Sequence, residues 1–176
     1  MIYESPEGTI CECCHPSGAI DSEGQILVMW RNWLAGSRDM YLARSRDGIT
    51  FSKPEKLGAG TWKLNACPMD GGGLAIFHGK VVTAWRRDHR IFLARPGEQE
   101  HAIADGTDVA IAASPGGIYA IWSTPNGLQA LVPRKPEPVV IAPKGLFPDI
   151  AAVPDGRALA AWEDDGKITI QTVPGR

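Results

Sequence analysis

The sequence predicts an all-β protein, a four-bladed β-propeller of four-stranded blades. Three observations predict it: a Gly and a Trp recur at a fixed spacing, short apolar runs flank each Gly, and helix-breaking residues are frequent. The 20 glycines and 14 prolines among 176 residues disfavour long helices, while 44% hydrophobic residues can supply a core. A chain of this length suits a single domain.

The repeat consists of a Gly in a turn signal and a Trp that follows it six residues later. Apolar runs on both sides of each Gly predict two antiparallel strands joined by a tight turn. The four pairs are Gly24 with Trp30, Gly79 with Trp85, Gly116 with Trp122, and Gly156 with Trp162. Because the spacing recurs four times, we expect four equivalent units.

A third strand is predicted after every Trp, at residues 40–44, 91–95, 128–132 and 167–173. Fourth, weaker strands are predicted at residues 53–60, 98–106 and 138–145, and the last unit has none. Residues 1–8 have an apolar start and a closing Gly like those of a fourth strand. We therefore expect this N-terminal strand to complete the last blade and close the ring, since closure removes unpaired sheet edges.

The closing glycines divide the single domain into four blades. Blade 1 covers about residues 9–60, blade 2 about 61–106, blade 3 about 107–145, and blade 4 about 146–176 together with 1–8. An alternative keeps the same repeats and pairs two chains into an eight-bladed ring. We expect a monomer or a homodimer.

The charge balance excludes several classes of partner. Lys plus Arg is 18 and Asp plus Glu is 20, so we expect no nucleic-acid binding through phosphate neutralisation.

The apolar runs are too short for a membrane span. The first residues lack the basic and apolar regions of a signal peptide, so we expect a cytoplasmic protein, or a periplasmic one if an export segment precedes this start.

All four cysteines lie in the loops that lead into the first two blades, on the face that carries ligands in propellers. Soft sulfur donors suit Zn(II) or Cu(I), so we expect a metal or redox site there. Two alternatives remain open: one or two disulfides, or reduced thiols packed in the neck of the channel. The candidate ligands are Cys11, Cys13, Cys14, Cys67, His15 and Met69.

The same face carries a candidate pocket for a small molecule, a glycan or a protein ligand. Arg31 and Arg86 directly follow the marker Trp of adjacent blades, so we expect them at equivalent places. They could hold a carboxylate or phosphate, with Trp33, Trp62 and Asp70 beside them. In the alternative, the arginines form salt bridges that hold the loops, and the two tryptophans are packing residues.

One segment, Ser45-Arg46-Asp47-Gly48-Ile49-Thr50-Phe51, resembles the Asp-box repeat of bacterial sialidases. The runs Ile10-Cys11-Glu12-Cys13-Cys14-His15-Pro16 and Cys67-Pro68-Met69-Asp70-Gly71-Gly72-Gly73 are similar to bacterial sialidase-like propeller proteins. The resemblance implies a propeller fold, with the Asp-box as a turn between the third and fourth strands, opposite the active site. It also implies an exo-sialidase site with three arginines, a Tyr nucleophile, a Glu and an Asp.

The chain lacks the Arg-Ile-Pro motif of those enzymes, and Tyr3, Tyr41 and Tyr119 fall in predicted strands away from the axis. We therefore expect a non-catalytic binding or interaction module. Its site would be the cysteine-lined metal or redox site on the face of blades 1 and 2. The alternative is an exo-sialidase-like glycoside hydrolase.

Overall fold

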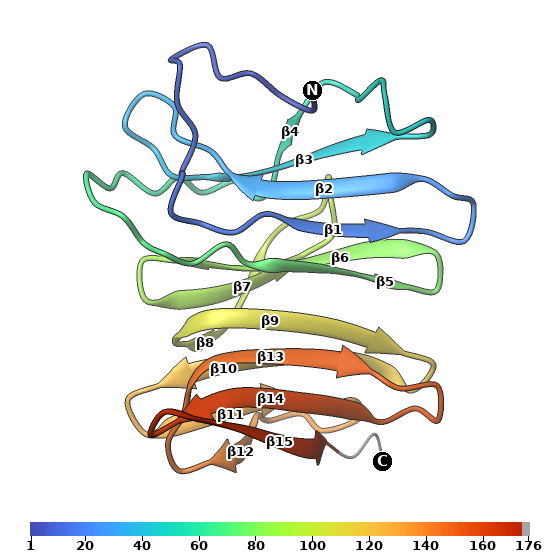
Figure 1. The fold of residues 1–176 in the computed structure, drawn as a ribbon, viewed down its shortest axis with the longest axis vertical. Helices are drawn as coiled ribbons and strands as arrows, with labels where there is room; N and C mark the ends of the chain where they lie inside the picture. Colours follow the sequence, from blue (N-terminus) through green and yellow to red (C-terminus); the bar gives the residue numbers. More distant parts are fainter. Residues whose placement is uncertain (174–176) are drawn as a thin grey trace.

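The computed structural model describes residues 1–173, which form strands joined by turns and loops. Of the four antiparallel sheets, the first two follow one another along the longest axis of the molecule, and the third and fourth overlap in this view at its other end (Figure 1). Among the described residues, none belongs to a helix that could cross a membrane. The all-β class and the four sheet units are therefore confirmed.

Each sheet is a meander in which consecutive strands pair in antiparallel fashion. The first sheet contains β1 (Ser17–Ile20), β2 (Ile26–Arg31), β3 (Met40–Ser45) and β4 (Glu55–Lys56). The second contains β5 (Gly73–Phe77), β6 (Lys80–Arg87), β7 (Arg90–Ala94) and β8 (His101–Asp105). The third contains β9 (Thr107–Ser114), β10 (Gly117–Thr124), β11 (Gly127–Leu131) and β12 (Val139–Ala142). The fourth contains β13 (Leu146–Ala152), β14 (Ala158–Asp164) and β15 (Lys167–Val173).

The marker tryptophans explain how neighbouring sheets pack. Each lies on the second strand of its sheet, and Trp85, Trp122 and Trp162 are buried against the preceding sheet. Trp85, for example, belongs to one apolar cluster with Leu27 and Met29 of β2. A large aromatic side chain at each interface removes much apolar surface from water, which is the main force that holds the sheets together.

The predicted N-terminal strand is wrong. Residues 1–8 form no strand, and they lie on the first sheet instead of the fourth (Figure 1). The ring of Tyr3 packs 5.2 Å from that of Trp30, and the Asn32 side-chain amide donates a hydrogen bond to the Tyr3 hydroxyl at 2.8 Å. The amide of Gly8 donates to the carbonyl of Ser5 at 3.0 Å, so the segment turns instead of continuing as an extended strand.

This placement also corrects the expected closure of the ring. No strand from the N-terminal segment joins the fourth sheet, which has three strands among the described residues, and β5–β9 separate the first sheet from β13 (Figure 1). The blade 4 expected from residues 146–176 and 1–8 is thus formed by β13, β14 and β15 among the described residues; residues 174–176 lie outside them. The sheets form an open, propeller-like row.

The segment Ser45–Phe51 lies between β3 and β4, where a turn is predicted. One carboxylate oxygen of Asp47 accepts hydrogen bonds from the amides of Ile49 and Thr50, at 2.8 and 2.7 Å. The amide of Gly48 donates to the Ser45 hydroxyl at 3.0 Å. The amides of Thr50 and Ile49 lower the pKa of Asp47 from 3.8 to about 2. The side chain thus holds the turn in its charged form.

The stability of this turn should depend on pH. Because the folded-state pKa of Asp47 is lower than its ordinary value, the carboxylate stabilises the fold above about pH 3.8. This stabilisation is lost as the pH falls through about 2. We expect Asp47→Asn, which cannot titrate, to show a smaller fall of the melting temperature than the wild type between pH 5 and pH 2. Thermal unfolding followed by circular dichroism at a series of pH values measures the difference.

The exposed Asp105→Asn variant is the control, since Asp105 is a residue of strand β8 and not of this turn. It should follow the wild-type pH profile. Parallel profiles for the wild type and Asp47→Asn would show that the charge of Asp47 does not hold the turn.

Candidate functional site

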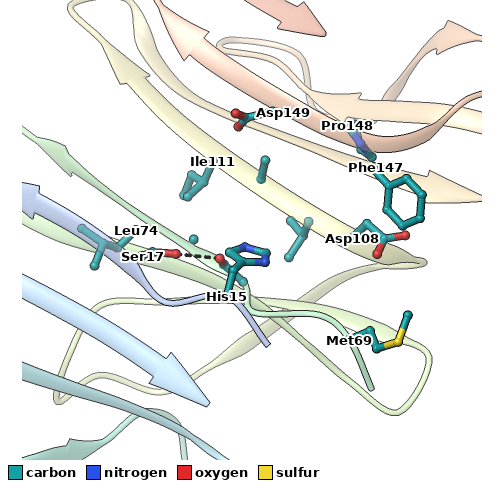
Figure 2. A pocket seen from close by; sticks show the side chains of 13 residues that line it. His15, Ser17, Met69, Leu74, Asp108, Ile111, Phe147, Pro148 and Asp149 are labelled. Carbon is teal, nitrogen blue, oxygen red and sulfur yellow. Dashed lines mark hydrogen bonds between the residues drawn. The ribbon is translucent and has the colours of Figure 1, made fainter. Parts of the chain in front are cut away.

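A groove of about 420 Å³ runs along the first strands of the four sheets (Figure 2). The segments that lead into β1 and β5 line it, together with residues of β1, β5, β9 and β13 themselves. The lining residues with polar, sulfur or aromatic side chains that could contact a ligand are His15, Ser17, Met69, Asp108, Phe147 and Asp149. All four sheets therefore contribute to one groove.

Close backbone packing forms one wall of the groove. A side chain at Gly71 would lie 2.0 Å from the backbone oxygen of His15, so only glycine permits this approach. The hydroxyl of Ser17 donates to the carbonyl of Gly72 at 2.8 Å and joins the wall to β1 (Figure 2). Gly71-Gly72-Gly73 thus brings the second sheet close to the first.

The four cysteines gather where the segment before β1 meets the loop between β4 and β5. Cys13 is joined to Cys67 by a disulfide, which connects the segment before β1 to the loop between β4 and β5. Cys11 and Cys14 are free and buried. Their sulfur atoms lie 3.1 Å apart, and that of Cys13 lies 3.7 Å from Cys11 and 3.9 Å from Cys14. These three sulfurs form a group compact enough to hold a metal ion.

Two arginines give the cysteine group a positive environment. The Arg38 guanidinium donates a hydrogen bond to the Cys11 sulfur at 3.1 Å. The pKa of Cys11 is lowered to about 6, first by the hydrogen bond from Cys14 and then by Arg38, against the opposing effect of burial. The pKa of Cys14 is raised, because its proton is held in the hydrogen bond to Cys11 and because it is buried. The surroundings therefore favour a thiolate at Cys11 over one at Cys14.

Arg31 ties together the segments around the cysteines. Its side chain is buried, and its guanidinium donates to the carbonyls of Asp70, Arg38 and Arg86 at 2.9, 2.8 and 2.9 Å. Burial lowers its pKa, and the negative charges nearby oppose that effect. Because these guanidinium N–H groups bond to backbone carbonyls of the chain itself, Arg31 supports the alternative in which the arginines hold the loops.

Asp70 is the buried acid of this region. One carboxylate oxygen accepts from the amide of Asp108 at 2.8 Å, and the Arg86 guanidinium lies 3.9 Å away. Within residues 1–173, the other oxygen has no hydrogen-bond partner. Burial raises the pKa of Asp70 above its ordinary value. Asp70 therefore joins the second sheet to the third beneath the groove.

The two tryptophans expected in a ligand pocket contact arginines. Trp62 is buried, and the guanidinium groups of Arg31 and Arg86 lie 5.2 and 5.3 Å from the centre of its ring. Trp33 has the Arg38 guanidinium 4.8 Å from its ring centre. Cation–π contacts of this kind hold loops in place. Trp62 also forms part of a shallow depression with Lys63 and His89, outside the groove.

The structure thus divides the predicted site residues between two places. The cysteines form one compact group, while His15 and Met69 line the groove, which no cysteine lines among the described residues. Sequence reasoning did not find Arg38 as the partner of Cys11, nor the groove aspartates Asp108 and Asp149. Both aspartates lie on the first strand of a sheet, β9 and β13, and that position was the signal for them.

No protein-family profile and no curated protein matches the chain. Among solved structures, it is similar to a glycosyl hydrolase from Bacteroides ovatus, with a TM-score of 0.51 and 12% identity over 92% of this chain and 65% of that one. Putative glycoside hydrolases from Bacteroides ovatus ATCC 8483 and Parabacteroides distasonis ATCC 8503 match with TM-scores of 0.45 and 0.44 and identities of 13 and 15%. Those two matches cover 90 and 86% of this chain and 67 and 62% of theirs. The first likeness shows that the two chains share a fold, and this chain spans less than two thirds of that structure's length.

The Arg31 guanidinium should contribute strongly to stability. Arg31→Met removes a buried charge with three hydrogen bonds and leaves three carbonyls without their donor, so we expect a loss of about 3 kcal/mol in the free energy of unfolding. Urea denaturation measures it. Arg46→Met is the matched control, because Arg46 is exposed and its nearest acid is 3.6 Å away; it should change stability by less than about 0.5 kcal/mol. Equal effects of the two substitutions would contradict the role given to Arg31.

Proposed function

We propose that this protein is a binding module that holds a soft metal ion, Zn(II) or Cu(I), on cysteine thiolates between its first two sheets. The observation that carries the proposal is the convergence of every cysteine in the chain on one place. Cys11, Cys13 and Cys14 lie within 4.8 Å of one another, and the bond to Cys13 places Cys67 beside them. Four thiolates are a common ligand set for structural zinc.

Two of the sulfur–sulfur distances match those around a tetrahedral ion, and the bonded pair Cys13 and Cys67 must separate on reduction before all four can bind one. Zinc–sulfur bonds of about 2.3 Å place neighbouring thiolates about 3.8 Å apart. The sulfur of Cys13 lies 3.7 and 3.9 Å from those of Cys11 and Cys14. Cys11 and Cys14, at 3.1 Å, would separate by about 0.7 Å to admit the ion. This movement is small because both residues belong to one short turn, in which the Cys14 amide bonds the Cys11 carbonyl.

The charges around the cysteines suit a metal–thiolate group. Four thiolates around a divalent ion carry a net charge of about −2, which is costly to bury without compensation. Arg38 donates directly to Cys11, and the Arg31 guanidinium lies beside the cluster. The amide of Asp70 also stabilises the thiolate of Cys14. Donors to ligand sulfurs of this kind hold a metal site in shape.

The disulfide and the metal site would be alternative states of the same four residues. The thiolate is the metal ligand, so Cys13 and Cys67 can bind an ion only when their bond is reduced. We expect the metal-bound state under reducing conditions and the Cys13–Cys67 disulfide under oxidising ones. Both states join the segment before β1 to the loop between β4 and β5.

The metal content of reduced protein tests the proposal. Protein purified under reducing conditions, without chelator or affinity metal, should contain about one zinc or copper ion per chain. Metal analysis by mass spectrometry measures the content. Cys11→Ser and Cys67→Ser should each lower it by more than about tenfold, because each removes a thiolate.

His15→Ala and Met69→Ala separate the four-cysteine site from the other ligands that the sequence suggests. Both residues line the groove, so these variants should keep the metal. Metal-free reduced protein, at the wild-type yield of folded chain, would overturn the proposal.

A second candidate function is glycan binding or hydrolysis in the groove. The observation in its favour is that Asp108 and Asp149 both line the groove, since paired carboxyl groups are the residues that glycoside hydrolysis uses. The similar structure from Bacteroides ovatus is a glycosyl hydrolase. No arginine lines the groove among residues 1–173, so a neutral sugar suits it better than a sialic acid. The exo-sialidase activity that the Asp-box resemblance implies requires arginines for the substrate carboxylate.

A panel of fluorogenic glycosides, neutral ones and a sialoside, tests this second function. If the groove is catalytic, a neutral glycoside should be hydrolysed, and Asp108→Asn or Asp149→Asn should lower kcat/KM by about 100-fold or more. Asp105→Asn, at an exposed position of β8, is the control and should keep full activity. Hydrolysis of the sialoside alone would contradict the assignment of a neutral sugar.

A further inference from the structure

The repeat places equivalent residues of the four first strands along the groove. In each sheet, the residue paired with the position just before the marker Trp lies on the first strand and lines the groove. These residues are Ser17, Gly73, Ala110 and Asp149. The first three have small side chains or none, which leaves room for a ligand, and the fourth supplies a carboxylate.

A second set of equivalent residues lies two positions earlier in the chain, and it consists of His15, Gly71, Asp108 and Phe147. His15, Asp108 and Phe147 line the groove (Figure 2). Because β9 and β13 pack against each other, Asp108 and Phe147 come from neighbouring strands at the same level of the repeat. The groove thus receives an imidazole, a carboxylate and an aromatic ring from equivalent places in three sheets.

Phe147 occupies its position at a cost in free energy. Its side chain is 61% exposed, and its φ of 50° lies in the left-handed region, although residues before a proline favour extended conformations. The pairing of β13 with β14 shifts register between Leu146 and Asp149, and an irregularity of this kind changes where a side chain points. A strained backbone and an aromatic ring left in water, both at one residue, favour a role in contact with a ligand.

The carboxylates beside Phe147 can accept hydrogen bonds from a ligand. Asp108 accepts one from the Thr107 hydroxyl at 2.7 Å, and Asp149 accepts one from the Ile150 amide at 2.8 Å, each through one oxygen. No lysine or arginine of residues 1–173 lines the groove. A ligand with several hydroxyl groups and an apolar face therefore matches both the carboxylates and the ring.

We propose that Phe147 is the stacking surface on which the groove binds a neutral pyranoside with equatorial hydroxyl groups, which donate to Asp108 and Asp149. This inference rests on the second function proposed above, glycan binding or hydrolysis in the groove. The two faces of such a sugar carry axial C–H bonds, which pack on the electron-rich face of an aromatic ring. Its hydroxyl groups point outward from the ring edge, where carboxylates can accept them.

Saturation-transfer NMR of the whole chain with methyl β-D-glucopyranoside tests the stacking. In this sugar every ring hydroxyl is equatorial. Saturation should be strongest at the axial C–H protons of one sugar face, because only that face lies on the ring of Phe147. Phe147→Leu should weaken binding by about tenfold or more, and Phe147→Tyr, which keeps an aromatic ring, should stay within about threefold of the wild type.

Phe147→Gly separates ligand binding from a structural role. Glycine adopts positive φ without strain, and Gly71 occupies the equivalent position of the second sheet, so this variant should melt at or above the wild-type temperature. It should still bind the sugar about tenfold more weakly or worse. A lower melting temperature together with lost binding would assign Phe147 a structural role and overturn the proposal.

Leu146→Ala is the matched control, because Leu146 is 54% exposed on the same strand and does not line the groove. It should bind the sugar like the wild type. Equal binding by the wild type, Phe147→Leu and Phe147→Gly would overturn the stacking role and leave the glycan function standing. A wild type that neither binds this sugar nor hydrolyses any neutral glycoside would overturn both. Binding of choline in place of the sugar would show a site for an organic cation and would also overturn the proposal.

Discussion

The buried guanidinium of Arg31 is the interaction on which the arrangement around the cysteines depends. It joins carbonyl groups from the β2–β3 loop, from the segment before β5 and from β6 in one set of hydrogen bonds. A cation with several donors in fixed directions is the side chain best suited to hold three backbones at once. Because it lies at the end of β2, directly after the marker Trp, the repeat itself places it there. The cysteines and the groove wall are both built against the segments that it holds.

The sequence was most informative where the repeat was regular. The spacing from Gly to Trp locates the second strand of every sheet. The glycine is required by the tight turn between the first two strands, and the Trp fills the interface with the adjacent sheet. The N-terminal strand is predicted because residues 1–8 resemble the ends of the other blades. The conformation of these residues is instead determined by contacts with residues far along the chain. Tyr3 packs on Trp30 and Asn32 bonds its hydroxyl, so the segment caps the first sheet. The sequence pattern of residues 1–8 does not predict those contacts.

The cysteine cluster of the candidate site could be predicted from the repeat, and the groove could not. Four cysteines in two loops at equivalent positions predicted one cluster, and the structure brings them together. The groove was harder to predict, because no sheet contributes more than two polar side chains to it and none stands out locally. Asp108 and Asp149 line the same groove as His15 only because the first strands of the four sheets come together in the folded chain. The arginines were found by position, but their hydrogen-bond partners are backbone carbonyls, which have no sequence signature.

The disulfide between Cys13 and Cys67 has a topological consequence. The two residues are 54 positions apart, and the enclosed segment contains the whole first sheet and no strand of the others. Closing a loop of that size removes about 4 kcal/mol of conformational entropy from the unfolded chain. The resulting stabilisation applies to the first sheet and not to the other three. A protease cut in the exposed turn at Gly48 would leave two fragments that stay covalently attached until a reductant is added. The redox state of the surroundings therefore determines whether a chain that has been cut inside the first sheet remains one covalent molecule.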